Sequence, residues 1–174
     1  MTKIYIIGHS NIDILSLGIA LQSKDDSLTV SPRFTTNKDD VTEYKYFLDK
    51  ETVNISYKNN AIITITTTDN ESNGIIYDDY YNNDIFCLNL AEFNIMPDKL
   101  FSGDDDVDVI VVWVDSSENV PKSEIAEVEY LEERLENVNY LYFCNESDDK
   151  IIDTIIEYLY ADPNKKEKML KEFA

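Results

Sequence analysis

The chain has few of the residues on which redox, metal and nucleophilic sites depend. Its 174 residues include two cysteines and one histidine. Cys87 and Cys144 each lie in an apolar, strand-like run, so we expect buried thiols in a reducing compartment rather than a disulfide. Together with His9 they fall short of the four ligands that a structural zinc site takes. With a single histidine, Ser10 also lacks the partners of a Ser-His-Asp triad.

Positive charge is scarce as well: 15 Lys and Arg stand against 35 Asp and Glu, which gives a formal net charge of -20. So acidic a chain has no basic surface from which phosphate contacts would release counterions, and this argues against direct binding of nucleic acid. The charge favours solubility in a crowded compartment, or a protein partner with a basic surface. No apolar run approaches the roughly 20 residues that span a bilayer, and the N-terminus lacks a signal-peptide pattern. We therefore expect a cytoplasmic protein with no membrane contact.

Glycine is limited to four residues, and this matters most after the first apolar run, residues 3–7. Residues 8–16 (GHSNIDILS) lead into an apolar helical segment, which is the layout of a strand, a phosphate-binding loop and a helix. A working loop holds several glycines, a lysine and a Ser or Thr. Along that pattern Ile14 stands at the lysine position and Leu15 at the hydroxyl position. The sequence thus predicts a phosphate loop without its chemistry, made of Gly8, His9, Ser10, Asn11 and Asp13.

Alternating strand and helix patterns predict the fold class. Short apolar runs rich in β-formers predict strands at residues 3–7, 84–90, 107–114 and 139–144. Apolar residues at helical spacing predict helices over 12–22 (with Asn11 as N-cap), 123–135 and 148–160. This alternation favours α/β architecture with a mainly parallel sheet of about five strands, flanked by helices. We expect one domain over 1–174, with a C-terminal helix or tail at 161–174.

A small β insertion is predicted around residues 29–76. Residues 28–30 are expected to form a short strand and residues 61–68 a long one, because both segments are rich in β-branched side chains. Ser72, Asn73 and Gly74 form a turn signal between strands. Trp113, in the middle of an apolar run, is expected in the core.

These segments, in this order, resemble a guanylate kinase over most of residues 3–160. Residues 8–13 stand where that family has Gly-Pro-Ser-Gly-x-Gly, and residues 34–36 (FTT) near its Thr-Thr-Arg. Residues 43–51 look like its Asp-Tyr-x-Phe and Lys-Glu stretch, residues 60–74 like its hairpin ending in Tyr-Gly, and residues 139–146 like its last strand. The resemblance implies a nucleoside monophosphate kinase fold. It also implies a monophosphate cleft, reused by a partner or vestigial, formed by Arg33, Thr35, Thr36, Tyr44, Tyr46 and Gly74.

Two readings stay open at the level of single residues. Tyr44 and Tyr46 belong either to that cleft or to the packing of a small sheet across which they alternate. His9 either contacts a phosphate or a base, or is an ordinary loop residue with a backbone contact.

Departures from the family concern phosphate chemistry. The chain has two arginines, Arg33 and Arg134, where the family uses several in its lid and monophosphate site. A short acidic stretch, residues 120–135, stands where an arginine-rich flap would be, and Leu90 replaces the aspartate on the magnesium side. Phosphoryl transfer needs positive charge around the transferred group. We therefore expect an inactive domain without catalytic residues, metal or cofactor, which serves as a protein-binding or structural module, for instance in a viral assembly.

Two other functions remain open on the sequence. One is an active nucleotide or deoxynucleotide monophosphate kinase with a displaced lysine, Lys24 or Lys45, and for it alone ATP and magnesium are expected. The other is an acidic DNA mimic that inhibits a nucleic-acid-binding protein through clusters at residues 78–79, 104–108 and 124–136. The cluster at 104–108 lacks the ligand order and glycine of an EF-hand, so we expect a solvated turn there and no calcium site.

Overall fold

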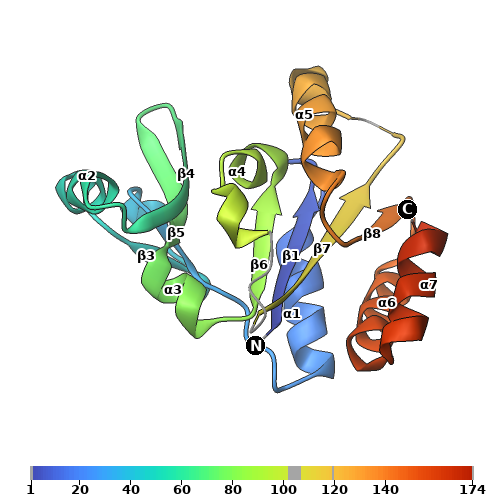
Figure 1. Cartoon of the computed structure of the whole chain (residues 1–174). Helices are drawn as coiled ribbons and strands as arrows, with labels where there is room; N and C mark the ends of the chain where they lie inside the picture. Colours follow the sequence, from blue (N-terminus) through green and yellow to red (C-terminus); the bar gives the residue numbers. More distant parts are fainter. Residues whose placement is uncertain (1, 102–106, 119, 174) are drawn as a thin grey trace.

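A sheet of four parallel strands forms the centre of the computed structural model, which describes residues 2–101, 107–118 and 120–173. Across this main sheet the order is β6 (Ile85–Asn89), β1 (Thr2–Gly8), β7 (Asp108–Asp115) and β8 (Tyr140–Cys144). All four lie where the sequence predicts strands, and their parallel pairing confirms the fold class (Figure 1). The strands are almost continuously apolar because helices cover both faces of the sheet.

Side chains of β1 alternate between two cores on the two faces of the main sheet. Ile4 and Ile6 belong to one core, and Tyr5 and Ile7 to the other; all four are fully buried. The first core is closed by α1 (Ile14–Lys24), α6 (Asp148–Tyr160) and α7 (Pro163–Phe173). The second is closed chiefly by α4 (Leu90–Asn94) and α5 (Ile125–Leu135). The sheet is thus the middle of three layers.

A second, smaller sheet lies beside the main one (Figure 1). Its strand order is β3 (Lys45–Phe47), β2 (Arg33–Thr35), β5 (Glu71–Ile76) and β4 (Ile62–Thr68). β2 pairs with β3 in parallel and with β5 antiparallel, and β4 and β5 form a hairpin. The other helices in the described residues are η1 (Lys38–Asp40), α2 (Lys50–Lys58), α3 (Tyr77–Asn82), η2 (Asp98–Leu100) and η3 (Lys122–Glu124). The small sheet is the predicted β insertion.

The predicted turn at residues 72–74 is wrong, because these residues lie inside β5. The hairpin turns instead at Asp69 and Asn70, whose φ angles are 52° and 66°. Asp and Asn tolerate this left-handed conformation better than most residues, and two such residues suit a tight hairpin. Gly74 has a different role: a Cβ there would lie 2.2 Å from the carbonyl oxygen of Thr64. It permits close approach of two strands rather than a turn.

Two boundaries differ from the prediction at the start of the chain. The first long helix begins at Ile14 with Asp13 as its N-cap, not Asn11, because the Asp13 carboxylate accepts the Ser16 N–H. Residues 28–30 form no strand: only Val30 makes a bridge, to Ile85. The backbone N–H of Val30 donates to the Gln22 side chain instead of a ladder. In the described ranges the main sheet therefore has four strands rather than about five.

Of the burial predictions, the one for Trp113 is confirmed and the one for the two cysteines is wrong. Trp113 is 6% exposed, which confirms its predicted place in the core. Cys87 and Cys144 are free and half-buried, so the prediction of two buried thiols is wrong. Acidic residues 104–106 lie outside the described residues. No helix in the described part of the chain is both long and apolar enough to cross a membrane.

Candidate functional site

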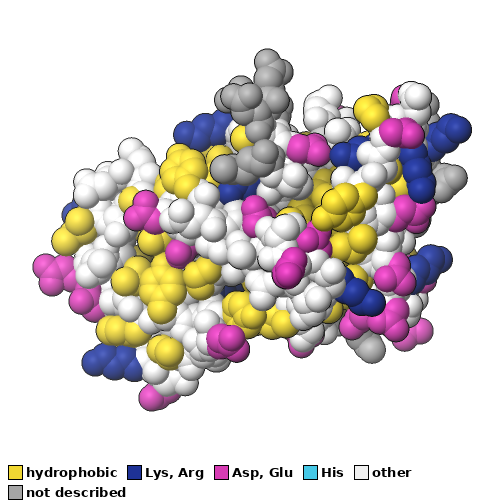
Figure 2. Space-filling model, turned by 90° about the horizontal axis from the view of Figure 1, so that it is seen from below, with side chains coloured by type: hydrophobic (Ala, Val, Ile, Leu, Met, Phe, Trp, Pro, Cys, Tyr) yellow, Lys and Arg dark blue, Asp and Glu magenta, His cyan; other side chains and the backbone are white. Residues whose placement is uncertain are grey.

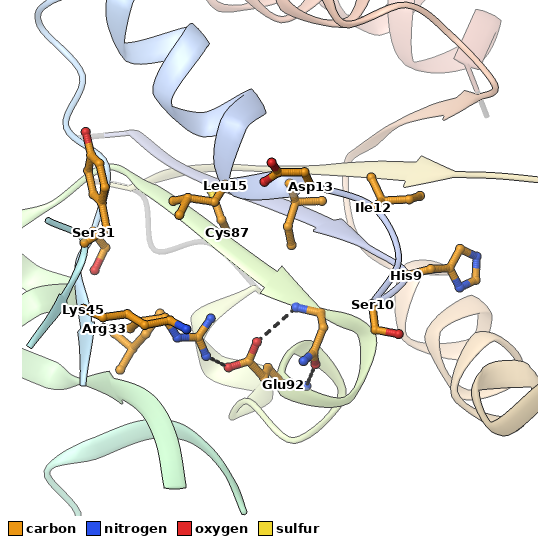
Figure 3. A pocket seen from close by; sticks show the side chains of 14 residues that line it. His9, Ser10, Ile12, Asp13, Leu15, Ser31, Arg33, Lys45, Cys87 and Glu92 are labelled. Carbon is orange, nitrogen blue, oxygen red and sulfur yellow. Dashed lines mark hydrogen bonds and ion pairs between the residues drawn. The ribbon is translucent and has the colours of Figure 1, made fainter. Parts of the chain in front are cut away.

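A cavity of about 340 Å³ opens between the two sheets, at the carboxyl ends of β1 and β6. Figure 3 shows Ile12, Asp13 and Leu15 along one side and Arg33 and Lys45 along the other. The crevice outside the carboxyl ends of parallel strands is the usual ligand position in such folds. The cavity is therefore the candidate functional site.

On one side of the cavity, the loop after β1 enters α1 with a carboxylate at the helix start. Oδ1 of Asp13 accepts the backbone N–H of Ser16 at 3.1 Å, and Oδ2 accepts the Ser16 hydroxyl at 2.7 Å. Gly8, at the end of β1, leaves no room for a side chain: a Cβ would lie 2.8 Å from Cγ2 of Ile14. The free N–H groups of a helix start attract anions. In this chain the helix start has an internal anion, Asp13.

His9 is the only buried polar residue of this loop, with 2% exposure. Its Nε2 lies 2.7 Å from Oδ1 of Asp115, at the end of β7, and its Nδ1 lies 3.2 Å from Oε2 of Glu124, in η3. The other carboxylate oxygen of Glu124 accepts the backbone N–H of Ser10 at 3.0 Å. Neither interpretation of His9 from the sequence describes this arrangement, because the imidazole pairs with two carboxylates of the chain itself.

On the opposite side, Arg33 forms an ion pair with Glu92, which is 1% exposed. Glu92 is held by a capping box at the start of α4: its Oε1 accepts the N–H of Asn89 at 3.1 Å, and its own N–H donates to Oδ1 of Asn89 at 2.9 Å (Figure 3). Burial lowers the pKa of Arg33, but a guanidinium stays charged in proteins. The positive charge of Arg33 is thus balanced inside the chain.

Lys45 and Cys87 complete the polar groups of interest in the cavity. The ammonium of Lys45 pairs with Asp40 at 3.1 Å, and this pair is partly exposed. Burial raises the pKa of the Cys87 thiol to about 12, despite the nearby guanidinium of Arg33. At neutral pH Cys87 is therefore a weakly reactive thiol.

The structure brings together only part of the predicted site. Of the loop residues, His9, Ser10 and Asp13 line the cavity; of the predicted cleft residues, Arg33 and Tyr44 do. Gly8 and Asn11 are not part of its lining, nor are Thr35, Thr36, Tyr46 and Gly74. The hydroxyl of Tyr46 donates to Asp79 at 2.5 Å, and Oγ1 of Thr36 accepts the N–H of Ser72 at 2.8 Å. The contact of Thr36 joins two parts of the insertion, and the contact of Tyr46 joins the insertion to α3.

Sequence reasoning did not identify three carboxylates of the site: Glu92 as the partner of Arg33, and Asp115 and Glu124 as the partners of His9. For Glu92 a signal exists, because Asn89 followed three residues later by Glu is close to a capping-box pattern. Asp115 directly follows a predicted strand, whose end lies at the ligand edge of the sheet. Glu124 gives no such signal, since it is one acid among many on an acidic stretch.

Among the described residues, no group of three or more His, Cys, Asp and Glu is placed to hold a metal ion. The two carboxylates around His9, those of Asp115 and Glu124, are engaged in hydrogen bonds with other groups of the chain.

Comparison with family models gives no match, and comparison with curated proteins gives none either. Comparison with solved structures does: the chain is similar to the crystal structure of guanylate kinase from Anaplasma phagocytophilum, with a TM-score of 0.55. The sequence identity is 14%, and the alignment covers 91% of this chain and 84% of that one. At such an identity the likeness concerns the fold. The main sheet and the small sheet together therefore have a guanylate-kinase-like fold, as the resemblance in sequence implies.

Proposed function

We propose that this domain is a catalytically inactive relative of the nucleotide kinases that binds a protein partner through the face containing the cavity. The observation that carries the proposal is the carboxylate of Asp13 at the start of α1. A phosphate bound at this helix start would have to displace Asp13 and meet its negative charge. Ile14 supplies no cation at the lysine position beside it.

The remaining groups of the cavity fit magnesium-bound ATP poorly. Arg33 already pairs with Glu92, and Lys45 pairs with Asp40. The second arginine, Arg134, donates to the carbonyl oxygens of Phe93 and Met96, both at 2.6 Å, and belongs to another pocket. One missing electrostatic donor commonly costs ~10²–10³ in rate. Here the loop lysine is absent and the arginines are engaged elsewhere, so turnover at a useful rate is not expected.

The charge of the surface supports a partner with a basic or mixed surface. Figure 2 shows the lower face of Figure 1, away from the cavity: Asp and Glu are spread over it, and Lys and Arg are most frequent toward the side of α6 and α7. A net charge of -20 accelerates the encounter with a basic partner and makes the association rate fall with salt. A setting in a viral assembly stays a prediction.

Two measurements test the loss of catalysis. Thermal unfolding is followed with ATP, GMP or dGMP at increasing concentration, because binding to the native state alone raises the Tm. A coupled assay follows ADP formation with ATP and each monophosphate. We expect no rise in Tm with ATP and no turnover. A rate near ~1 s⁻¹, an ordinary kinase speed, would refute the proposal.

A third measurement tests the partner. Proteins captured from the source by the wild-type domain are compared with those captured by Asp13→Lys and Glu43→Lys. Glu129→Lys, on the exposed surface of α5, is the matched control for the change in net charge. We expect affinity and its salt slope to fall for the first two variants only. Equal losses in all three would indicate binding through overall charge, and no loss in any would place the interface elsewhere.

An active kinase is the second candidate, and one observation favours it: Lys45 lines the cavity. Lys24, the other displaced lysine, lies in the last turn of α1, at the far end from the loop. Lys45→Ala decides between the candidates if turnover is found, because turnover that depends on Lys45 must fall by at least the ~10² of a lost donor.

A further inference from the structure

Glu124 occupies the loop after β1 much as a bound anion would. One carboxylate oxygen accepts the backbone N–H of Ser10 at 3.0 Å, and the other lies 3.2 Å from Nδ1 of His9. The Glu124 side chain is 13% exposed and the imidazole 1%. Glu124 comes from η3, directly before α5, so these two contacts hold the start of α5 against the loop.

The other ring nitrogen of His9 is anchored more firmly. Its Nε2 lies 2.7 Å from Oδ1 of Asp115, and that same oxygen accepts the N–H of Ser116 at 2.8 Å. The second oxygen of Asp115 accepts the hydroxyl of Tyr142, in β8, at 2.7 Å. Burial and the contact with Asp115 raise the pKa of Tyr142, so its hydroxyl stays a donor. Asp115 is therefore fixed at the carboxyl end of β7.

Both ring nitrogens of His9 thus face carboxylate oxygens, so the hydrogen bonds of the ring depend on how many protons it carries. A doubly protonated imidazole donates to both carboxylates, whereas a neutral ring donates to one and turns a lone pair toward the other. The shorter, better anchored contact is the one to Asp115. A neutral ring therefore keeps its proton on Nε2 and presents a bare Nδ1 to Glu124.

We propose that Glu124 is a pH-sensitive latch, an internal anion that closes the loop after β1 while the His9 ring carries two protons and lets it open when Nδ1 loses its proton. The titratable groups that face the ring come from three elements: Asp115 of β7, Glu124 of η3 and, through Asp115, Tyr142 of β8. Opening exposes the N–H of Ser10 and frees the start of α5. The latch does not depend on the absence of catalysis, since the same contacts would regulate an active loop.

Two substitutions at Glu124 separate the latch from a merely structural contact. Glu124→Ala removes both acceptors, so the loop should open at every pH. Glu124→Gln keeps an oxygen to accept the Ser10 N–H and gains an NH₂ group that donates to a bare Nδ1. This variant should therefore stay closed after the ring becomes neutral. Glu129→Gln, an exposed site on α5, is the control for the lost charge.

The readout is the protection of the Ser10 amide against hydrogen exchange, relative to an unstructured peptide at the same pH. His9 is the only histidine, so its ring ¹⁵N signals report its protonation without ambiguity. We expect wild-type protection to fall about tenfold or more once the ring signals report loss of the Nδ1 proton, the equilibrium effect of losing a hydrogen bond to a charged group. Protection should be low throughout in Glu124→Ala, and in Glu124→Gln it should not fall when Nδ1 loses its proton, because only the neutral ring can accept from the Gln NH₂ group.

Wild-type protection that does not follow the ring signals would overturn the pH dependence, and Glu124→Ala with wild-type protection would overturn the latch itself. Should Glu124→Ala fail to fold, Glu124→Gln still decides, because a wild-type pH profile in that variant contradicts the proposal. Kinase assays play no part in this test, so its failure is distinguishable from failure of the proposed function.

Discussion

Arg33 of β2 and Glu92 of α4 form an ion pair that ties the small sheet to the main one. Glu92 is almost completely buried, whereas the Arg33 side chain is 21% exposed. The pair lies in the wall of the cavity and replaces contacts that an anionic ligand would make with Arg33. Because the pair joins the two sheets, it should also contribute to the stability of the fold.

The first prediction is that Glu92→Gln destabilises the fold. The change leaves the largely buried guanidinium of Arg33 without its counter-charge, and breaking a buried pair on one side costs several kcal/mol. Because Arg33 is partly exposed, we expect about 2–4 kcal/mol in the free energy of unfolding, measured by urea denaturation. Glu146→Gln is the control, since it breaks the exposed pair with Lys150 and should cost less than about 1 kcal/mol. Equal losses in the two variants would contradict this account.

Arg134 leads to the second prediction. Its guanidinium donates to the carbonyl oxygens of Phe93 and Met96 and to Asp98, and it lies 4.6 Å from the ring centre of Phe101. A lysine keeps the charge but cannot reproduce the planar fork. We expect Arg134→Lys to lower the free energy of unfolding by about 1–3 kcal/mol, because carbonyl groups lose partners. Lys150→Ala, which removes an exposed pair with Glu146, should change it by about 0.5 kcal/mol at most. A lysine variant as stable as wild type would show that charge alone suffices.

The main sheet was predictable from the sequence for a physical reason. Strands buried on both faces leave apolar runs such as residues 3–7 and 107–114. The turn of the small hairpin was not, because two turn signals compete, Asp69-Asn70 and Ser72-Asn73-Gly74. Only the pairing of Thr68 with Glu71 in the folded hairpin decides between them.

The candidate site was predictable in position but not in chemistry. The strand-loop-helix layout locates Asp13 and His9, yet it contains no information on partners far along the chain. His9 and Glu124 lie 115 positions apart, and their contact exists only after β1 and β7 have paired. Short-range patterns report which residues can bind, whereas tertiary pairing decides which of them are already engaged.

The third prediction concerns Gly74, which the structure moves from a turn into β5. A Cβ at this position would lie 2.2 Å from the carbonyl oxygen of Thr64 and within 3 Å of the Phe34 ring. Gly74→Ala must therefore push two strands apart, and we expect a loss of about 1–3 kcal/mol in unfolding free energy, as for an overpacked core. Asn70→Gly in the true turn should be neutral or slightly stabilising, because glycine adopts positive φ without strain. If the alanine variant were the more stable of the two, the assignment of the turn would be wrong.

The last prediction uses the thiol of Cys87, a half-buried residue that lines the cavity. Its pKa is raised from 9.0 to about 12, chiefly by burial, which disfavours the thiolate in the folded state. At pH 8 the reactive thiolate is thus about a thousandfold rarer than in an ordinary cysteine, and labelling by a thiol reagent should slow accordingly.

Two single-cysteine variants isolate the reaction: Cys144→Ser reports Cys87, and Cys87→Ala reports Cys144. We expect Cys87 to react rapidly only in urea. Because the pKa of Cys87 is higher in the folded than in the unfolded state, the protonated thiol stabilises the fold in full below about pH 9. This contribution to the free energy of unfolding is lost as the pH rises toward about 12. Rapid labelling of Cys87 in the native state at pH 8 would mean that the cavity opens to solvent far more often than the packing around Gly18 allows.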